Sequence, residues 1–437
     1  MHNKTKVIFG TFLGLAAVCF LIILYAVFTD NNAWIGPALT IFFLLTAIGF
    51  HGFTRTKKFA YTIWIFAAVT ISMNYPEYFL TLGDFKLQLL IVPLLQIIMF
   101  GMGSQLSIQN FADVIKMPKG VIIGVICQFS IMPVIGITLA TVFGLPPEIA
   151  AGVVLVGSSP SGLASNVMSF IARANLALSV TLTAVATLLA PVLTPLLMKM
   201  LAGQYVPIDF WGMMLSIINI VILPIIAGLL FNAIGYGKYS VRSIIWQTFV
   251  FLLIIIAKNS INLFTTQVSF SDQIMILMQD AVWFLILPAL AAYLFKTLSK
   301  GNKGWLDKTM SLVSMIGIAV IITIITASGR DSLLQIGLAL ILASLIHNIA
   351  GYSLGYWLCK LVGMDEKSCR TISLEVGMQN GGLASGIALE MGKVATIGLA
   401  PAVFGPLMNI TGSSLATWWR GKPVKEDNAG TDNNHNK

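Results

Sequence analysis

The sequence is poor in charged side chains and in the residues that bind transition metals. Only 10% of its 437 residues are Asp, Glu, Lys or Arg, and it has four Cys and four His. No cysteine belongs to a C-x-x-C pair, which argues against a disulfide framework and against a zinc site. It has no H-E-x-x-H motif, and residues 157–162 lack the G-x-S-x-G spacing. An intramembrane enzyme is therefore disfavoured.

Apolar residues are what the chain has in abundance. Hydrophobic residues make up 57% of it and its mean hydropathy is +0.88, which predicts an all-α polytopic membrane protein. A spanning helix needs about 20 apolar residues, and about fourteen stretches approach or exceed this length. We predict spans near 7–28, 34–52, 59–74, 86–104, 119–144, 147–170, 175–201, 208–233, 244–263, 274–297, 308–328, 332–361, 368–391 and 395–419.

The net charge of +9 is explained by membrane topology. With the N-terminus inside, 21 of the 26 Lys and Arg residues fall on the cytoplasmic side, as the positive-inside rule requires. Nucleic-acid binding would need a basic folded domain, and the sequence does not indicate one. We therefore expect a multi-pass protein of the cell (inner) membrane with both termini cytoplasmic. Residues 421–437 are polar and predict a disordered cytoplasmic tail.

Two segments far apart in the chain carry similar interruptions. Residues 160–166 read P-S-G-L-A-S-N and residues 380–386 read N-G-G-L-A-S-G, each within an apolar run. Paired interruptions of this kind mark a transporter's substrate site near the middle of the bilayer. Glu375 precedes the second one, where a charge costs roughly 3 kcal/mol, so we expect a cation or a proton as its partner. The pattern indicates an ion-coupled carrier.

Four motifs around these interruptions resemble those of the bile acid:sodium symporter family. They are Q-F-x-I-M-P at 128–133, G-x-A-S-N-V-M at 162–168, N-x-A-L-S-V-x-x-T at 175–183 and E-V-G-M-Q-N at 375–380. The similarity covers roughly 56–238 and 305–420. The resemblance implies ten core helices in two inverted five-helix repeats. It also implies two discontinuous helices that cross between a panel domain and a core domain.

The same resemblance implies two Na⁺ sites and a place for the substrate. Carried over position by position, the first sodium site consists of Ser165, Asn166, Ser179, Thr183 and Glu375. The second consists of Gln128, Glu375, Gln379 and the backbone carbonyls of Val376 and Met378. Candidate substrate contacts are Leu163, Asn380 and Asn409. Leu163 stands where some similar bacterial proteins carry a Thr.

The chain also departs from the family pattern by two additional helical pairs. The domain boundaries that we predict are an extra N-terminal hairpin at 1–55, a first repeat at 56–204, the first helix of the second repeat at 205–239, an inserted hairpin at 240–304, the remainder of the second repeat at 305–420 and the tail at 421–437. Because each addition consists of two membrane spans, the core keeps its orientation in the membrane.

Several of these residues have simpler structural interpretations. Ser179 and Thr183, four apart on one helical face, could each bond the carbonyl four residues earlier. Gln128 and Gln379 could join helices. Glu375 could pair with Arg370 near the membrane surface. For three further polar residues we expect no role in transport. Asp280 and Glu390 should be solvated near outer helix ends, and His347 should be packed and hydrogen-bonded.

Hard oxygen ligands and exposed helix N-termini together favour Na⁺ and a small organic anion. We expect sodium-coupled symport of such an anion, for example a bile acid-like, keto acid or pantothenate-like compound, by alternating access. The alternative is a proton-coupled organic anion carrier or an antiporter, with Glu375 titrating. Expected partners are the anion, sodium ions and the lipid bilayer.

Overall fold

The structure is a computed structural model that describes residues 2–29, 31–54, 56–236, 239–265, 269–299, 303–422 and 424. It is almost entirely helical within these residues, with one two-stranded antiparallel sheet, β1 (Thr81–Leu82) with β2 (Phe85–Lys86). The α-helices are α1 (His2–Phe28), α2 (Asn32–Phe50), α3 (Ala60–Asn74), α4 (Ile91–Gln105), α5 (Ile108–Ala112), α6 (Pro118–Val142), α7 (Pro147–Ser158), α8 (Leu163–Ile171), α9 (Leu176–Leu197), α10 (Phe210–Ile217), α11 (Leu223–Gly235), α12 (Val241–Thr265), α13 (Phe270–Ala281), α14 (Leu287–Ser299), α15 (Lys303–Ser328), α16 (Arg330–Leu361), α17 (Glu366–Gly377), α18 (Gly381–Glu390) and α19 (Leu399–Arg420).

The predicted membrane character is confirmed. Ten helices in the described part of the chain are long and apolar enough to cross a membrane, and each coincides with a predicted span. The other four predicted spans correspond to the short helix α3, to α19, and to two pairs of short helices, α7 with α8 and α17 with α18. Of the tail predicted at 421–437, only residues 421, 422 and 424 are among the described residues.

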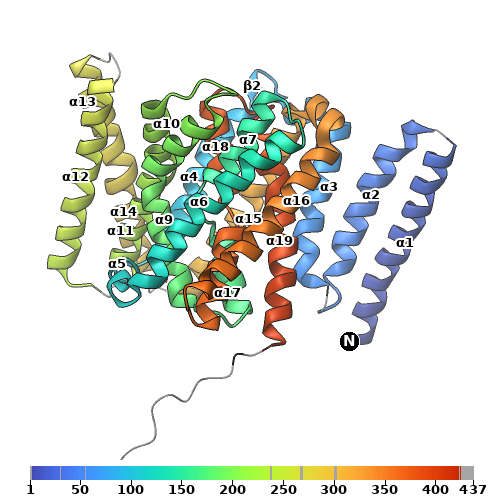
Figure 1. Ribbon diagram of the computed structural model, residues 1–437, viewed down its shortest axis with the longest axis horizontal. Helices are drawn as coiled ribbons and strands as arrows, with labels where there is room; N and C mark the ends of the chain where they lie inside the picture. Colours follow the sequence, from blue (N-terminus) through green and yellow to red (C-terminus); the bar gives the residue numbers. More distant parts are fainter. Residues whose placement is uncertain are drawn as a thin grey trace, which may run out of the picture.

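The helices form two groups that surround the interrupted segments. In one group α4 packs against α11 and α15, and α15 packs against α3. In the other, α6 packs against α7, α9, α16 and α17, while α16 also packs against α19. Figure 1 shows α1 beginning and α19 ending at the same lower side of the molecule.

The two additional helical pairs lie at opposite ends of the molecule (Figure 1). Helix α1 packs against α2, which packs against α3, whereas α12 and α14 pack against α11. Both pairs therefore extend the group formed by α3, α4, α11 and α15. A π-helical segment, Val282–Ile286 (η7), joins α13 to α14, and another, Ile218–Ile222 (η6), joins α10 to α11.

A close backbone contact fixes α4 against α11. A Cβ atom on Gly103 would lie 2.2 Å from the carbonyl oxygen of Ile225, and one on Gly228 would lie 2.3 Å from that of Phe100. These distances leave no room for a side chain at either position. The two glycines therefore set how closely the helices approach.

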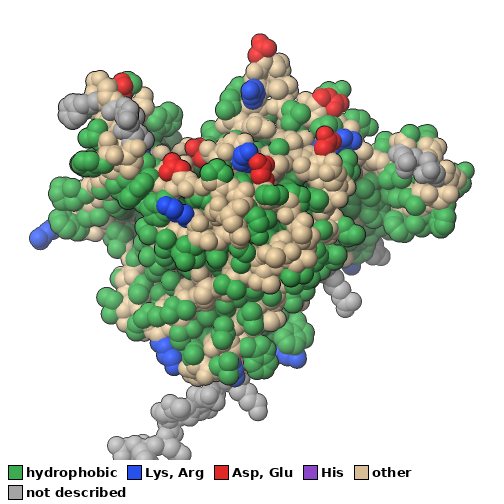
Figure 2. All heavy atoms as spheres, turned by 45° about the horizontal axis from the view of Figure 1, so that its top comes forward, with side chains coloured by type: hydrophobic (Ala, Val, Ile, Leu, Met, Phe, Trp, Pro, Cys, Tyr) green, Lys and Arg blue, Asp and Glu red, His purple; other side chains and the backbone are tan. Residues whose placement is uncertain are grey.

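The surface agrees with burial in lipid. Figure 2 shows a broad band of hydrophobic side chains across the face in view, with acidic and basic groups together toward its upper part and basic groups at its lower end. Exposed apolar residues on lipid-facing helices carry no solvation penalty in a bilayer, because lipid tails are as apolar as they are.

Candidate functional site

The two interruptions meet and hydrogen-bond to each other. Ser161 and Gln379 form an antiparallel bridge. The Gly162 N–H donates to the Met378 carbonyl at 3.0 Å, and the Asn380 N–H donates to the Pro160 carbonyl at 2.8 Å. Non-helical backbone in a membrane requires such partners, since no water is available there. The bridge therefore places the ends of α7, α8, α17 and α18 at one point.

Glu375 lies one helical turn before this bridge and is surrounded by hydroxyl groups. Its side chain is fully buried. Ser179 and Ser165 donate to its Oε1 atom at 2.5 and 2.7 Å, and Ser161 and Thr183 donate to its Oε2 atom at 2.6 and 2.7 Å. The donors come from α8, α9 and the interruption, so three separate segments converge on one carboxylate.

This cluster contains more acceptor oxygens than protons. Ser165 lies 2.7 Å from both the Gly162 carbonyl and Glu375. Ser179 and Thr183 each lie near Asn166 Oδ1, at 2.8 and 3.2 Å, as well as near Glu375. A hydroxyl carries a single proton, so each can satisfy one of its two acceptors. The remaining oxygen contacts are of the kind that a hard cation satisfies.

The residues predicted for the second sodium site also lie together. Gln128 Nε2 donates to Gln379 Oε1 at 2.6 Å and to the Ser159 carbonyl at 2.9 Å. Gln379 Nε2 donates to the Val376 carbonyl at 2.6 Å. Gln128 Oε1 is buried without a hydrogen-bond partner in the described structure. The Met378 carbonyl already accepts from Gly162, and the hydrogen bonds of Glu375 run to the first cluster.

A cavity of about 230 Å³ lies next to the bridge, between the two helix groups. All three predicted substrate contacts, Leu163, Asn380 and Asn409, line it. The rest of its wall is mainly apolar, and no Lys, Arg, His, Asp or Glu belongs to it. Asn380 Oδ1 caps α18 by accepting from the Leu383 N–H at 3.0 Å, whereas its buried Nδ2 has no partner in the described structure. The cavity thus offers an unused amide donor.

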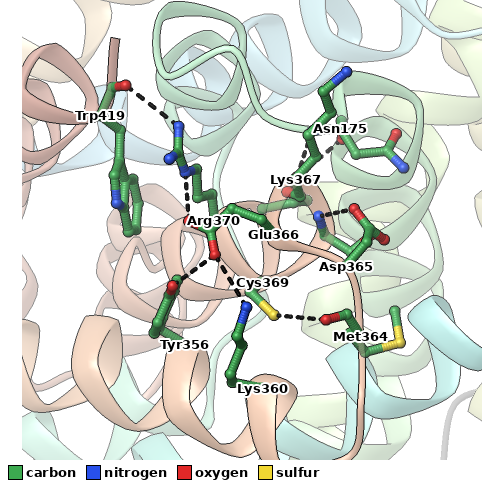
Figure 3. Close-up of polar contacts among 12 residues, drawn as sticks. Asn175, Tyr356, Lys360, Met364, Asp365, Glu366, Lys367, Cys369, Arg370 and Trp419 are labelled. Atoms are coloured by element: carbon green, nitrogen blue, oxygen red, sulfur yellow. Dashed lines mark hydrogen bonds and ion pairs between the residues drawn. The ribbon is translucent and has the colours of Figure 1, made fainter. Parts of the chain in front are cut away.

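Two of the simpler interpretations are wrong. Ser179 and Thr183 bond side chains of the cluster rather than the carbonyls four residues earlier. Arg370 pairs with Glu366 at 2.9 Å and also donates to the Trp419 carbonyl, as Figure 3 shows, so it is not the partner of Glu375.

Asp280 likewise departs from its expected solvation, because it pairs with Lys258 at 2.8 Å. Other expectations are confirmed. Glu390 is exposed. His347 is packed against Phe404, and its Nε2 atom contacts the Met132 carbonyl at 2.8 Å.

Two features were missed from the sequence. Ser161 belongs to the P-S-G interruption that drew attention to the segment, and its hydroxyl directly contacts Glu375. Its position inside that motif was the available signal. The Lys258–Asp280 pair had no such signal, since the two residues lie on different helices of the inserted hairpin.

The chain is also similar to known proteins. The model of the sodium bile acid symporter family matches residues 92–263. The sodium-dependent transporter YocS of Bacillus subtilis (strain 168) is 35% identical over 370 residues, which cover 84% of this chain and 93% of that relative. The chain belongs to the sodium bile acid symporter family.

Other relatives from the family are more distant. The probable sodium/metabolite cotransporter BASS1 of Arabidopsis thaliana is 28% identical over 76% of this chain and 67% of the relative. The ileal sodium/bile acid cotransporter of Oryctolagus cuniculus is 29% identical over 67% of each chain. Family membership and the apolar helices identify this chain as a sodium-dependent transporter of the membrane. The relatives carry names of transporters and cotransporters, and none of these names describes an enzyme.

Proposed function

We propose that this chain carries a small organic anion across the cell membrane together with two sodium ions, by alternating access. The first sodium ion is bound by Ser165, Asn166, Ser179, Thr183 and Glu375, to which we add the Ser161 hydroxyl. The second is bound by Gln128, Glu375, Gln379 and the carbonyls of Val376 and Met378.

The observation that carries the proposal is the excess of oxygen acceptors around the buried Glu375. In the described part of the chain no group of three or more His, Cys, Asp and Glu residues gathers, which disfavours a transition metal. Neutral hydroxyl and amide oxygens with a single carboxylate suit a monovalent hard cation. Bound sodium would also offset the cost of keeping Glu375 ionised inside the membrane.

The substrate follows from the cavity beside this cluster. Pockets that enclose drug-sized ligands are about 300 to 1,000 Å³, and this one is about 230 Å³, so it suits a smaller compound. The free Nδ2 donor of Asn380 and the N-terminus of α8 suit one carboxylate. The cavity wall has no Lys or Arg for a second one, and its apolar side chains suit an apolar body. We therefore favour a small monocarboxylate, such as a keto acid or a pantothenate-like acid, over a bulky sterol.

The arrangement of helices supports the remaining parts of the proposal. Helices α3, α4, α11 and α15 form the panel, and α6–α9 with α16–α19 form the core, as two inverted five-helix repeats. The additional hairpins belong to the panel because they pack against α3 and α11. Both termini are cytoplasmic, in agreement with α1 beginning and α19 ending at the same side of the molecule.

Sodium-dependent thermal stabilisation of the purified protein tests the ion. We expect the melting temperature to rise with sodium at constant ionic strength and not with choline, since a ligand that binds only the folded state stabilises it. Uptake of labelled keto acids, pantothenate-like acids and bile acids into proteoliposomes tests the substrate. Uptake driven by a proton gradient in the absence of sodium would instead support the alternative, in which Glu375 exchanges a proton.

A further inference from the structure

A second cavity, which has a polar lining and is distinct from the substrate cavity, lies between the inserted hairpin and the rest of the transporter. Its volume is about 290 Å³. Its polar lining comes from six helical segments, α4, α10, η6, α12, α13 and α18, and consists of Gln96, Ser216, Asn219, Lys258, Asp280 and Glu390. Gln96 lies on the panel helix α4, and Ser216 and Asn219 lie on α10 and η6, which lead into the panel helix α11. The inserted hairpin contributes Lys258 and Asp280, and the core helix α18 contributes Glu390. Three structural units therefore share this cavity.

The hairpin's contribution is a buried ion pair. Lys258 is 5% exposed, and its Nζ atom lies 2.8 Å from Asp280 Oδ2. Asn259 Nδ2 donates to the same oxygen at 2.9 Å. Both contacts use Oδ2, so Oδ1 keeps its acceptor capacity within the described part of the chain. Charged residues inside a membrane are expensive and mark sites of ion binding more often than they serve packing alone.

The backbone is π-helical in two of the segments around the cavity. Asn219 belongs to the π-helical segment η6 and Phe284 to the π-helical segment η7, and both residues line the cavity. Such segments are rare and occur frequently at functional sites. The Asn219 carbonyl accepts from Gln96 Nε2 at 3.3 Å, and the buried Asn219 Oδ1 has no hydrogen-bond partner in the described structure.

The charges lining this cavity do not cancel. Lys258 and Asp280 neutralise each other, which leaves the carboxylate of Glu390 with a Ser216 hydroxyl 3.5 Å away. The lining contains no further Lys or Arg. A net negative charge together with unused oxygen acceptors disfavours an anion and favours a small hard cation.

We propose that this cavity binds one sodium ion, through Glu390, Asn219 Oδ1 and the free oxygen of Asp280. The choice of sodium over another hard cation rests on the proposed function. A neighbouring cavity of about 350 Å³ shares Ser216 and Glu390 with this one, and the exposed Glu390 side chain gives the ion an entry path. An ion at this position joins the inserted hairpin, the panel and the core.

Equilibrium dialysis of the purified full-length protein with ²²Na⁺ tests the proposal, with choline keeping the ionic strength constant. We expect Glu390→Gln to bind one sodium ion fewer per chain than the unchanged protein. Asn219→Ala should lower the affinity for that same ion by roughly tenfold or more. The matched control is Asp331→Asn, which removes an exposed carboxylate outside the cavity and should leave the number of bound ions unchanged.

The Glu375→Gln variant separates this site from the two proposed near the interruptions. It should keep the ion that Glu390→Gln loses, and the double variant should bind none. If Glu390→Gln and Asn219→Ala both bind sodium like Asp331→Asn, the cavity holds no sodium ion. If Glu375→Gln binds as many ions as the unchanged protein while Glu390→Gln loses one, the proposed function fails and this site stands. Should Glu390→Gln not remain monodisperse, the affinity of Asn219→Ala decides.

Discussion

The Ser161 hydroxyl donates to Oε2 of Glu375 at 2.6 Å, although 214 positions separate the two residues. This contact joins the first interruption to the helix that leads into the second. The bridge between Ser161 and Gln379 lies directly beside it. The carboxylate and the crossing point of the chain are therefore parts of one structure, and a ligand of Glu375 also contacts both crossing segments.

Glu375→Gln should abolish sodium-dependent uptake. The substitution keeps the size and one oxygen but removes the charge that offsets the desolvation of two cations. Expression and folding should be largely retained, because Gln can still accept hydrogen bonds from the surrounding hydroxyls. Uptake into proteoliposomes over a range of sodium concentrations measures the effect, and size-exclusion chromatography checks the fold. Near-normal sodium affinity in this variant would contradict the site assignment.

Ser179→Ala should have a milder effect. It removes one neutral oxygen from one site, so transport should continue with a higher sodium requirement. We expect the sodium concentration for half-maximal uptake to rise by roughly tenfold, in line with the removal of one hydrogen-bonding oxygen worth about 1.4 kcal/mol. Ser130→Ala is a matched control, because that hydroxyl bonds only its own helix at the Ile126 carbonyl in the described structure. Equal sodium requirements for the two variants would exclude Ser179 as a ligand.

Leu163→Thr should change substrate preference. Leu163 lines the cavity at the start of α8, so a hydroxyl there should favour anions with a polar edge over anions with an apolar edge. One such change in a pocket is worth about 1 to 3 kcal/mol. Sodium affinity should stay within about threefold, because the side chain lies outside the oxygen cluster. Competition between pairs of labelled anions measures the preference, and an equal loss for all of them would count against the assignment.

Deletion of residues 1–54 should leave sodium binding intact. Helices α1 and α2 contact the rest of the molecule through α3 and lie at the far end from the inserted hairpin. None of the proposed sodium ligands lies on them. Sodium-dependent thermal stabilisation of the truncated protein measures this, with circular dichroism as the control for folding. A folded truncated protein that no longer responds to sodium would show that the hairpin contributes to the sites.

Asp280→Asn should destabilise the inserted hairpin. It leaves the Lys258 ammonium buried without an ionised partner, and breaking a buried pair costs roughly 3 to 5 kcal/mol. The double variant Lys258→Met and Asp280→Leu removes both charges and should recover most of the loss. Thermal unfolding without sodium compares the two, so that ion binding does not contribute. A single variant as stable as the unchanged protein would show that water reaches the pair.

The two interruptions and the oxygen-bearing residues around them could be predicted because their signals are local. Gly, Pro and Ser within an apolar run are visible in any short window, and the resemblance supplied the partners of Glu375. The pairing of Lys258 with Asp280 could not be predicted, since it depends on how α12 and α13 turn toward each other. The same holds for Asn219, whose unpaired oxygen results from a π-helical segment that the composition of α10 and α11 does not indicate.

The bridge between the interruptions is made by the main chain, through Gly162 with Met378 and Asn380 with Pro160. Main-chain hydrogen bonds survive most side-chain replacements. Substitutions at most positions should therefore leave the crossing point intact, while the side chains that line the neighbouring cavity can change. Side chains that line the cavity can therefore change without loss of the main-chain bridge beside the Glu375 cluster.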